Sequence, residues 1–310
     1  MDITVISQFF EQGRPSAQVA AAANLHRREQ LHLHGHDDLS DSAESLASKM
    51  RDSPDRRKIW LSAADEGRVV GDASAVLPQQ DNTTLAQIDL TADPDADMRA
   101  VLTPLWNELA ERVRAEGRTV AQSWTGHRLP TDGTETLTPA SGVGLLPCDA
   151  MTDFLLGEGF TLEQAERQST LVVAAARDSL DQHLEHAHAR ADTAYEILTW
   201  AGPSPDELVA DLAELYARMS IDVPTAGLES EPERWDVDRV RRNDQRAIDA
   251  GRTRISTVAR HRATGALVAY TDIDHPLDKP AAAFQEDTLV HGDHRGHRLG
   301  LLIKAANLRA

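Results

Sequence analysis

A pattern of residues recurs in this chain at an offset of 198 positions, and it restricts the fold more than any other feature of the sequence. Each copy reads as a short strand, a polar loop with aspartate, and the start of an amphipathic helix. The aligned pairs are Asp89 with Asp287, Asp95 with Asp293, Val101 with Leu299 and Leu105 with Ile303. In a chain of 310 residues, such a repeat predicts two domains that share one fold.

The sequence before each copy contains a predicted β-hairpin. Two runs rich in β-branched residues are separated by a turn with glycine, a pattern that is typical of a hairpin. The runs are 59–65 and 68–77 in the first half, with the turn Glu66-Gly67, and 253–261 and 267–274 in the second half, with the turn Ala263-Thr264-Gly265. The hairpin extends the repeat well beyond the first aligned residues.

One strand and two helices are predicted before each hairpin. They lie at 2–7, 16–33 and 42–52 in the first half and at 194–200, 204–220 and 236–251 in the second half. Ser204, Pro205 and Glu207 have the spacing of a capping box, which predicts that the helix at 204–220 begins at Ser204. Each half therefore has the order β-α-α-β-β-β-α.

The first half continues past its central helix, and this sets the expected domain organisation. We expect a strand at 118–125, a helix that ends at Gly159-Phe160 and a final strand within 161–173. The fold class is α+β, with tandem domains that are each a mixed, mostly antiparallel sheet flanked by helices. They are predicted at 1–175 and 193–310, joined by a polar, partly helical connector at 176–192. The same order would extend the second domain by roughly 60 residues, so we expect this domain to be truncated at its C-terminus.

The composition excludes several functional classes. A formal net charge of −18 argues against binding to nucleic acid, which needs a basic surface, and against an anionic membrane. This charge favours a cationic small molecule as partner, although solubility alone also accounts for it. We expect a monomer or a homodimer.

The few metal-binding and targeting signals in the sequence are weak. Cys148 is the single cysteine, so an intrachain disulfide and a thiolate metal cluster are excluded. Two groups of histidines fall in polar segments, where solvated side chains account for them better than a metal site: His32, His34 and His36, and His183, His186 and His188. The first residues lack the basic and apolar parts of a signal peptide, and no run reaches about 18 apolar residues. We therefore expect a cytoplasmic protein.

The stretch Thr288-Leu289-Val290, followed by Arg295-Gly296-His297-Arg298-Leu299-Gly300, carries the most specific signal. It resembles the GNAT acyltransferase superfamily, in particular tandem two-domain members such as the mycothiol synthase-like proteins. The family pattern is Arg/Gln-x-x-Gly-x-Gly/Ala at the start of the central helix. This chain keeps Arg295 and Gly300 but has Arg298 at the position of the middle glycine. The physics agrees, because unpaired amides at a helix N-terminus bind anions.

The resemblance implies an enzyme that transfers an acetyl group from acetyl-CoA, as cosubstrate, to a small amine within a ternary complex. The pyrophosphate would lie against residues 295–300, and the backbone of Leu289 and Val290 would pair with the pantetheine arm. An ammonium group must lose a proton before it attacks, which requires a base. Glu286 is the first candidate for this catalytic carboxylate and Asp287 is the second. An exposed carboxylate at a strand edge is the alternative reading of both.

The first copy lacks the features of a phosphate site. The residues aligned with the motif, 97–102, contain no glycine, and Asp95 and Asp97 would repel phosphate. We therefore expect a degenerate first domain and a second domain that binds acetyl-CoA. Two other hypotheses remain open at this point: a non-catalytic acyl-CoA-binding or regulatory module, and a structural partner that binds no CoA.

Overall fold

The computed structural model describes residues 1–222 and 226–310, with Asp192 described by its backbone only. The chain forms two compact units. The first unit consists of Met1–Gln168 and Pro224–Glu231, and the second consists of Ser169–Val223 and Pro232–Ala310. The domain boundaries expected from the sequence stay a prediction.

The first unit is built on a sheet of five strands in the order β1-β4-β5-β6-β7. The strands are β1 (Asp2–Val5), β4 (Arg56–Asp65), β5 (Arg68–Pro78), β6 (Leu85–Ala92) and β7 (Val120–Ser123). Neighbouring strands are antiparallel except β6 and β7. Glu66 and Gly67, with φ angles of 47° and 81°, connect β4 to β5. Two positive φ angles match the right-handed twist of a hairpin, as the sequence predicts for this turn.

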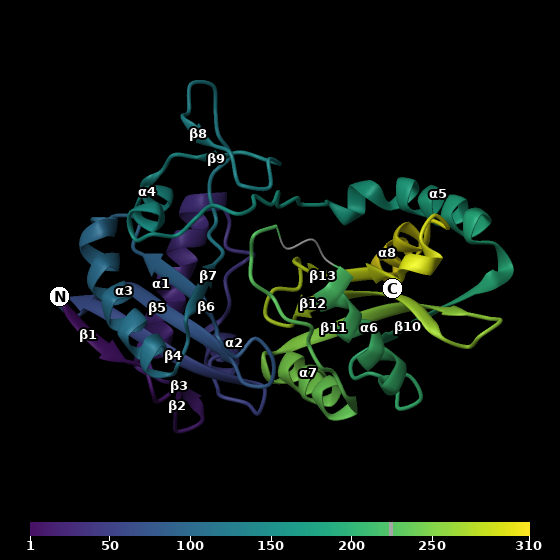
Figure 1. Cartoon of the computed structure of the whole chain (residues 1–310), viewed down its shortest axis with the longest axis horizontal. Helices are drawn as coiled ribbons and strands as arrows, with labels where there is room; N and C mark the ends of the chain where they lie inside the picture. Colours follow the sequence, from purple (N-terminus) through teal and green to yellow (C-terminus); the bar gives the residue numbers. More distant parts are fainter. Residues whose placement is uncertain (223–225) are drawn as a thin grey trace. The chain divides into compact units, whose positions relative to one another are not determined.

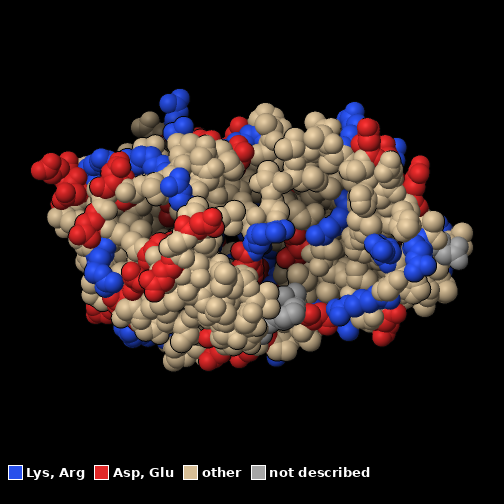
Figure 2. Space-filling view, turned by 90° about the horizontal axis from the view of Figure 1, so that it is seen from above, with Lys and Arg blue, Asp and Glu red and all other residues tan. Residues whose placement is uncertain are grey.

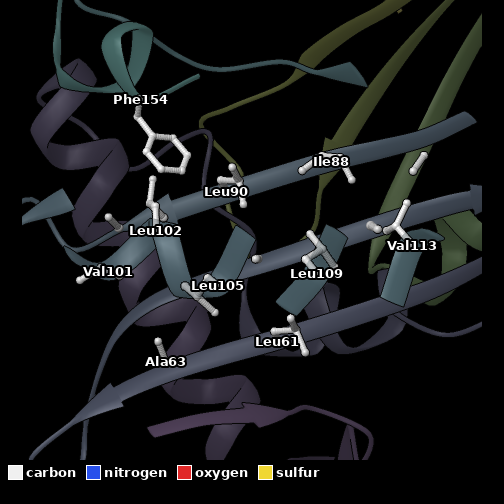
Figure 3. Close-up of a cluster of buried hydrophobic side chains, with 14 of the residues drawn as sticks. Leu61, Ala63, Ile88, Leu90, Val101, Leu102, Leu105, Leu109, Val113 and Phe154 are labelled. Carbon is white, nitrogen blue, oxygen red and sulfur yellow. The ribbon is translucent and has the colours of Figure 1, made fainter. Parts of the chain in front are cut away.

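Helices cover both faces of this first sheet. They are α1 (Ala17–His34), α2 (Ala43–Lys49), α3 (Met98–Ala115) and α4 (Ala150–Gly157). Figure 3 shows how leucines and valines of α3 point at the apolar face of the sheet, with Phe154 of α4 beside them. Leu102, Leu105 and Leu109 are fully buried there. The helices α1 and α2 cover the opposite face. Two short hairpins complete the unit: β2 (Phe10–Glu11) with β3 (Arg14–Pro15), and β8 (Thr136–Leu137) with β9 (Leu146–Pro147).

The second unit repeats this plan (Figure 1). Its sheet has the order β10-β11-β12-β13, and every neighbouring pair is antiparallel. The strands are β10 (Tyr195–Ala201), β11 (Arg252–His261), β12 (Leu267–Pro276) and β13 (Phe284–Val290). One face packs against α6 (Val209–Asp222) and α7 (Val237–Asp249), and the other packs against α5 (Val173–Ala191) and α8 (Leu299–Arg309). Within the described residues, no strand pairs with the outer edge of β13.

The strand register confirms the sequence repeat. In the first unit, Gly71 pairs with Ala92 and Ala73 pairs with Leu90. In the second unit, Ala269 pairs with Val290 and Thr271 pairs with Thr288. Each residue of the second set lies 198 positions after its counterpart. The two halves therefore share their strand pairing as well as their order of elements.

Two local predictions are wrong. Residues 161–172 contain no strand, because this segment is mostly polar and exposed and touches the rest of its unit through a few bonds, such as Ala140 N to Leu162 O (2.9 Å). The helix expected from Ser204 begins at Val209 instead. The backbone N–H and the hydroxyl of Ser204 both donate to the buried Asp244, each at 3.0 Å, so this serine cannot cap α6.

The expected connector is more helical and more buried than its composition suggests. Residues 173–191 form α5, whose Leu184, Ala187 and Ala191 are buried against α8. These residues recur at a helical period on an otherwise charged segment, so they form a narrow apolar stripe. In the part of the chain that the structure describes, no helix has the length and hydropathy of a bilayer span.

Candidate active site

The N-terminus of α8 is shaped by a loop with an unusual backbone. This loop runs from His291 at the end of β13, through the short 3-10 turn Gly292–His294, to Arg298. Gly296 has φ 88° and no atom lies within 4 Å of where a Cβ would stand. Arg298 also has a positive φ, 60°, which is uncommon for a residue with a side chain. This left-handed position is where the GNAT pattern has its middle glycine, so the geometry explains that preference.

The first turn of α8 has no side-chain cap among the described residues. The opening amide groups of a helix have no partner inside the helix, and they carry a partial positive charge. Gly300 lies in this turn, 3.6 Å from Val290 if a Cβ is added, so the helix packs closely on β13. Leu299 is buried and anchors the turn in the core. The first backbone N–H groups of α8 are therefore available to a ligand, and the backbone at Gly296 leaves room for that ligand to approach closely.

Basic and aromatic side chains surround this loop. The Arg295 guanidinium donates to the carbonyl of Val290 (Nε–O 3.2 Å) and lies 3.4 Å from a carboxylate oxygen of Asp222. His294 Nδ1 lies 3.0 Å from the hydroxyl of Tyr195, and the ring of His297 packs beside the same tyrosine. Burial and neighbouring histidines lower the pKa of His294. The permanent positive charge near α8 therefore comes from the arginines.

The backbone of β13 offers hydrogen-bonding groups on its outer edge. His291 N donates to Val268 O (2.8 Å), which makes this a hydrogen-bonded pair of the antiparallel ladder. Because such pairs alternate, the N–H and C=O of Leu289 point at β12, while those of Thr288 and Val290 point outward. Thr288 also shares a side-chain hydrogen bond of 2.7 Å with Thr271. Of the two backbones expected at the pantetheine arm, the geometry favours Val290.

Both candidate carboxylates lie in a β-bulge. The pairing of Thr271 with Thr288 is followed by that of Ile273 with Gln285, so β13 has one extra residue there. Glu286 and Asp287 together face the single residue Asp272 on β12. A bulge redirects side chains and bends the strand, and it is common beside active sites. Glu286 and Asp287 are exposed, and Glu286 Oε1 lies 3.7 Å from Arg252. Burial against the sheet raises the pKa of both carboxyls.

Sequence reasoning missed the polar groups beneath the bulge. Asp272 is 4% exposed and its Oδ2 accepts from the hydroxyl of Tyr216 (3.4 Å). Its other oxygen, Oδ1, has no hydrogen-bond partner in the structure as described. The neighbouring Asp274 differs, because Arg254 donates to both of its oxygens at 2.8 and 3.0 Å. The aspartates at alternate positions of the predicted strand 267–274, in the stretch YTDID, were the signal that could have pointed to these groups.

The corresponding place in the first unit is closed. Asp97 caps α3 by accepting from Ala100 N (3.0 Å), so the start of this helix already has its anion. The loop before it contains the buried Asp93, which is bound by Arg28 and Arg68. The strands β5 and β6 pair from Gly71 to Val76 without a bulge. In its backbone and its charges, this region of the first unit differs from the corresponding region of the second unit.

Comparison with known proteins identifies the fold. No protein-family model and no curated protein matches the sequence. A solved structure described as a tandem GNAT protein from the clavulanic acid biosynthesis pathway (without AcCoA) matches with a TM-score of 0.66 and 21% identity, over 99% of this chain and 85% of that one. A GCN5-related N-acetyltransferase from Sphaerobacter thermophilus matches with a TM-score of 0.52 and 12% identity, over 94% and 79%. This chain has a tandem GNAT fold.

The tandem GNAT fold accounts for the two similar units of this chain. Each unit contributes a sheet with helices on both faces, as the sequence predicts, and the fold class is confirmed. Within the tandem GNAT chain, the motif residues 295–300 lie at the start of the helix that follows β13. No cluster of three metal-ligating side chains occurs among the described residues.

Proposed function

We propose that this tandem GNAT protein is an acetyl-CoA-dependent N-acetyltransferase that acts on a small amine, with the site in its second unit. The observation that carries the proposal is the uncapped start of α8 beside the open edge of a bulged β13. Amides at a helix start bind phosphate groups, and a free strand edge can pair with an extended amide chain. Both features are needed to hold coenzyme A, and the first unit lacks the uncapped helix and the bulge.

The residues of the loop fit a diphosphate. Gly296 leaves its backbone unobstructed, and the guanidinium groups of Arg295 and Arg298 supply charge that does not depend on pH near neutrality. Arg295 is fixed by its bond to the Val290 carbonyl, so its charge is held next to the strand edge. The outward N–H of Val290 is the group available to polarise a thioester carbonyl.

The carboxylates of the bulge suit a cationic acceptor. Glu286 and Asp287 are exposed and adjacent, and Asp272 lies behind them. A protonated amine would be attracted to these groups and would give up its proton to one of them before attack. Glu286 lies 3.7 Å from Arg252, whereas Asp287 forms no ion pair within the described residues, so Asp287 is at least as good a candidate base as Glu286. The sequence placed Glu286 first and Asp287 second.

Isothermal titration with acetyl-CoA tests the proposal. We expect one site per chain, and the Arg295→Gln variant should bind about 10- to 100-fold more weakly, because a charge-assisted hydrogen bond contributes roughly 1.5–3 kcal/mol. Arg99→Gln is the matched control, since Arg99 is aligned with His297 and lies in the first turn of the capped α3 of the first unit. This control should bind as the wild type does.

Release of CoA with a panel of amines then tests catalysis. Spermidine and neamine are suitable first acceptors because both are small polycations. Binding without CoA release for any amine would favour a non-catalytic acyl-CoA-binding module. Absence of binding, or equal loss in Arg99→Gln and Arg295→Gln, would refute the placement of the site at α8.

A further inference from the structure

Asp272 is a buried carboxylate with one oxygen, Oδ1, that makes no hydrogen bond within the described residues. It faces Ser256 across β11 and the bulge residues Glu286 and Asp287 across β13. Tyr216 donates to Oδ2 (3.4 Å), and Oδ1 has no partner among the described residues. Leaving an oxygen of a buried carboxylate unbonded is unfavourable, and a catalytic role is one physical reason for such a group to be kept.

The charged surroundings of Asp272 determine how it titrates. The titratable groups around it are Arg254 on β11, Tyr216 on α6, Tyr270 and Asp274 on β12, and Glu286 and Asp287 on β13. Arg254 donates hydrogen bonds to both carboxylate oxygens of Asp274, so most of its positive charge is balanced by that residue. Burial dominates and raises the pKa of Asp272 to about 6, with the charges of Asp274 and Asp287 adding to the effect. The charge of Arg254 and a hydrogen bond with Ser256 act in the opposite direction and only partly offset the burial.

Asp272 and Asp287 are neighbours that differ in their access to solvent. Asp287 is exposed at the bulge, and Asp272 lies opposite it on the same face of the sheet but out of contact with solvent. Directly opposite residues in a sheet have Cβ atoms about 4.5–5.5 Å apart, which is close enough for two carboxyls to share a proton. The outer group can meet a ligand, while the inner group can only exchange protons with its neighbours.

We propose that Asp272 is the inner member of a proton-sharing pair with Asp287 and that it stores the proton which the acceptor amine gives up. This inference rests on the proposed acetyl transfer at β13. Asp272 acts through Asp287 and is a positioning residue, since it does not touch the acceptor.

The protons and bonds balance as follows. An ammonium N–H bond breaks and its proton passes to Asp287, then to Asp272, where an O–H bond forms. The free amine attacks the thioester carbon, the C–N bond forms and the C–S bond breaks. The second proton of the nitrogen goes to the leaving thiolate, and the proton stored on Asp272 returns to solvent through Asp287. The net products are the amide, CoA thiol and one proton.

Carbon-13 NMR of the whole chain labelled at aspartate Cγ tests the pairing without any substrate. We expect one aspartate signal to titrate with a midpoint near 6 and to be missing in Asp272→Asn. In Asp287→Asn the same midpoint should fall, because removal of a like charge favours ionisation of Asp272. Asp244→Asn is the control for a buried carboxylate, because Asp244 is fully used by Ser204, and it should leave the signal in place.

The pH profile of CoA release with spermidine or neamine tests the role. We expect Asp272→Asn to lower kcat about 100-fold with KM nearly unchanged, and to remove the acid limb near pH 6. Asp244→Asn should lower thermal stability and keep that limb. The inference is overturned if the midpoint does not respond to Asp287→Asn, or if Asp272→Asn keeps the acid limb. Failure of acetyl-CoA to bind would instead refute the proposed function, and the NMR titration would still decide whether the pair exists.

Discussion

The two units share one strand register and differ where β6 and β13 lead into their helices. In the first unit the strand is regular, the loop is acidic and α3 is capped by Asp97. In the second unit the strand is bulged, the loop is basic and α8 has no side-chain cap. The two units therefore share a framework and differ by one extra residue in a strand and by a few residues in a loop.

The two sheets also differ in how their buried aspartates are hydrogen-bonded. In the first unit His26 Nε2 (2.7 Å) and Trp60 Nε1 (3.2 Å) both contact Asp72 Oδ2, so that carboxylate is neutralised. In the second unit Asp272 keeps an oxygen without a partner. A buried carboxylate with all its hydrogen bonds made stabilises a structure, whereas one with an unbonded oxygen destabilises it and leaves that oxygen available for proton transfer. Figure 2 shows basic and acidic side chains mixed on one face of the molecule. The difference between the buried Asp72 and Asp272 cannot be read from such surface charges or from the net charge.

The largest effect should come from the paired core positions Leu105 and Ile303, which are both fully buried. Leu105→Ala and Ile303→Ala should each lower the free energy of unfolding by about 2–5 kcal/mol, because each leaves a cavity. Leu105→Ala should leave the acetyl-CoA affinity of the second unit unchanged, whereas Ile303→Ala should weaken it. Urea unfolding and titration calorimetry measure the two quantities. Equal effects of both variants on affinity would show that acetyl-CoA binding does not depend on the second unit alone.

The pH dependence of stability should separate the units next. Burial lowers the pKa of His26, but the charge and hydrogen bond of Asp72 outweigh it and raise this pKa to about 9. Since this exceeds the unfolded value of 6.5, the stabilisation is complete below pH 6.5 and is lost as the pH rises through 9. It amounts to at most roughly 3 kcal/mol. Urea unfolding at pH 6.5 and 9 should show this loss in the wild type.

Asp72→Asn is the control for this pH effect, since it removes the partner and should flatten the dependence above pH 7. Asp272, with a pKa of about 6, titrates mostly below that window. Glu29, whose pKa burial raises to about 7, titrates within the lower part of the window in both proteins, so the difference between wild type and Asp72→Asn isolates the contribution of His26. A wild type as stable at pH 9 as at pH 6.5 would contradict the pairing of His26 with Asp72.

Giving α8 the cap that α3 has should abolish most binding. In Arg298→Asp, the new carboxylate would accept from amides of the first turn and would repel phosphate, as Asp97 does in the first unit. We expect acetyl-CoA affinity to fall about 100-fold while the free energy of unfolding changes by less than about 1 kcal/mol. Asp97→Arg in the first unit is the mirror control and should leave affinity unaltered. An Arg298→Asp protein with wild-type affinity would mean that the diphosphate lies elsewhere.

The sequence was sufficient for the framework because hairpins and helix caps are local. Glu66-Gly67, Ser16 and Ser42 act where their residue types predict, and the offset between Asp89 and Asp287 reproduces the strand register. Ser204 misled because its hydroxyl found a tertiary partner, Asp244, in place of the helix backbone. Local patterns fail where a distant residue competes for the same hydrogen bond.

The site was only partly predictable for a related reason. The loop from Arg295 to Gly300 has a linear motif, and it leads into the start of α8 as the motif predicts. The bulge at Glu286 and Asp287 and the burial of Asp272 arise from pairing between strands, which no linear motif records. The left-handed backbone of Arg298 was equally hidden, since arginine normally avoids it. Pairing between distant segments thus determines the chemistry of the site.

The smallest effect concerns that strained arginine. Arg298→Gly should raise the free energy of unfolding by up to about 1 kcal/mol, because glycine accepts φ 60° and part of the gain is offset by the entropy of the unfolded chain. The same change should weaken acetyl-CoA about 10-fold through loss of a guanidinium. Glu66→Gly, at φ 47° in the first unit, is the matched control: it should relieve similar strain and keep full affinity. If Arg298→Gly binds as tightly as the wild type, the arginine is tolerated at this position and not used, and the loop backbone alone accounts for the difference between the units.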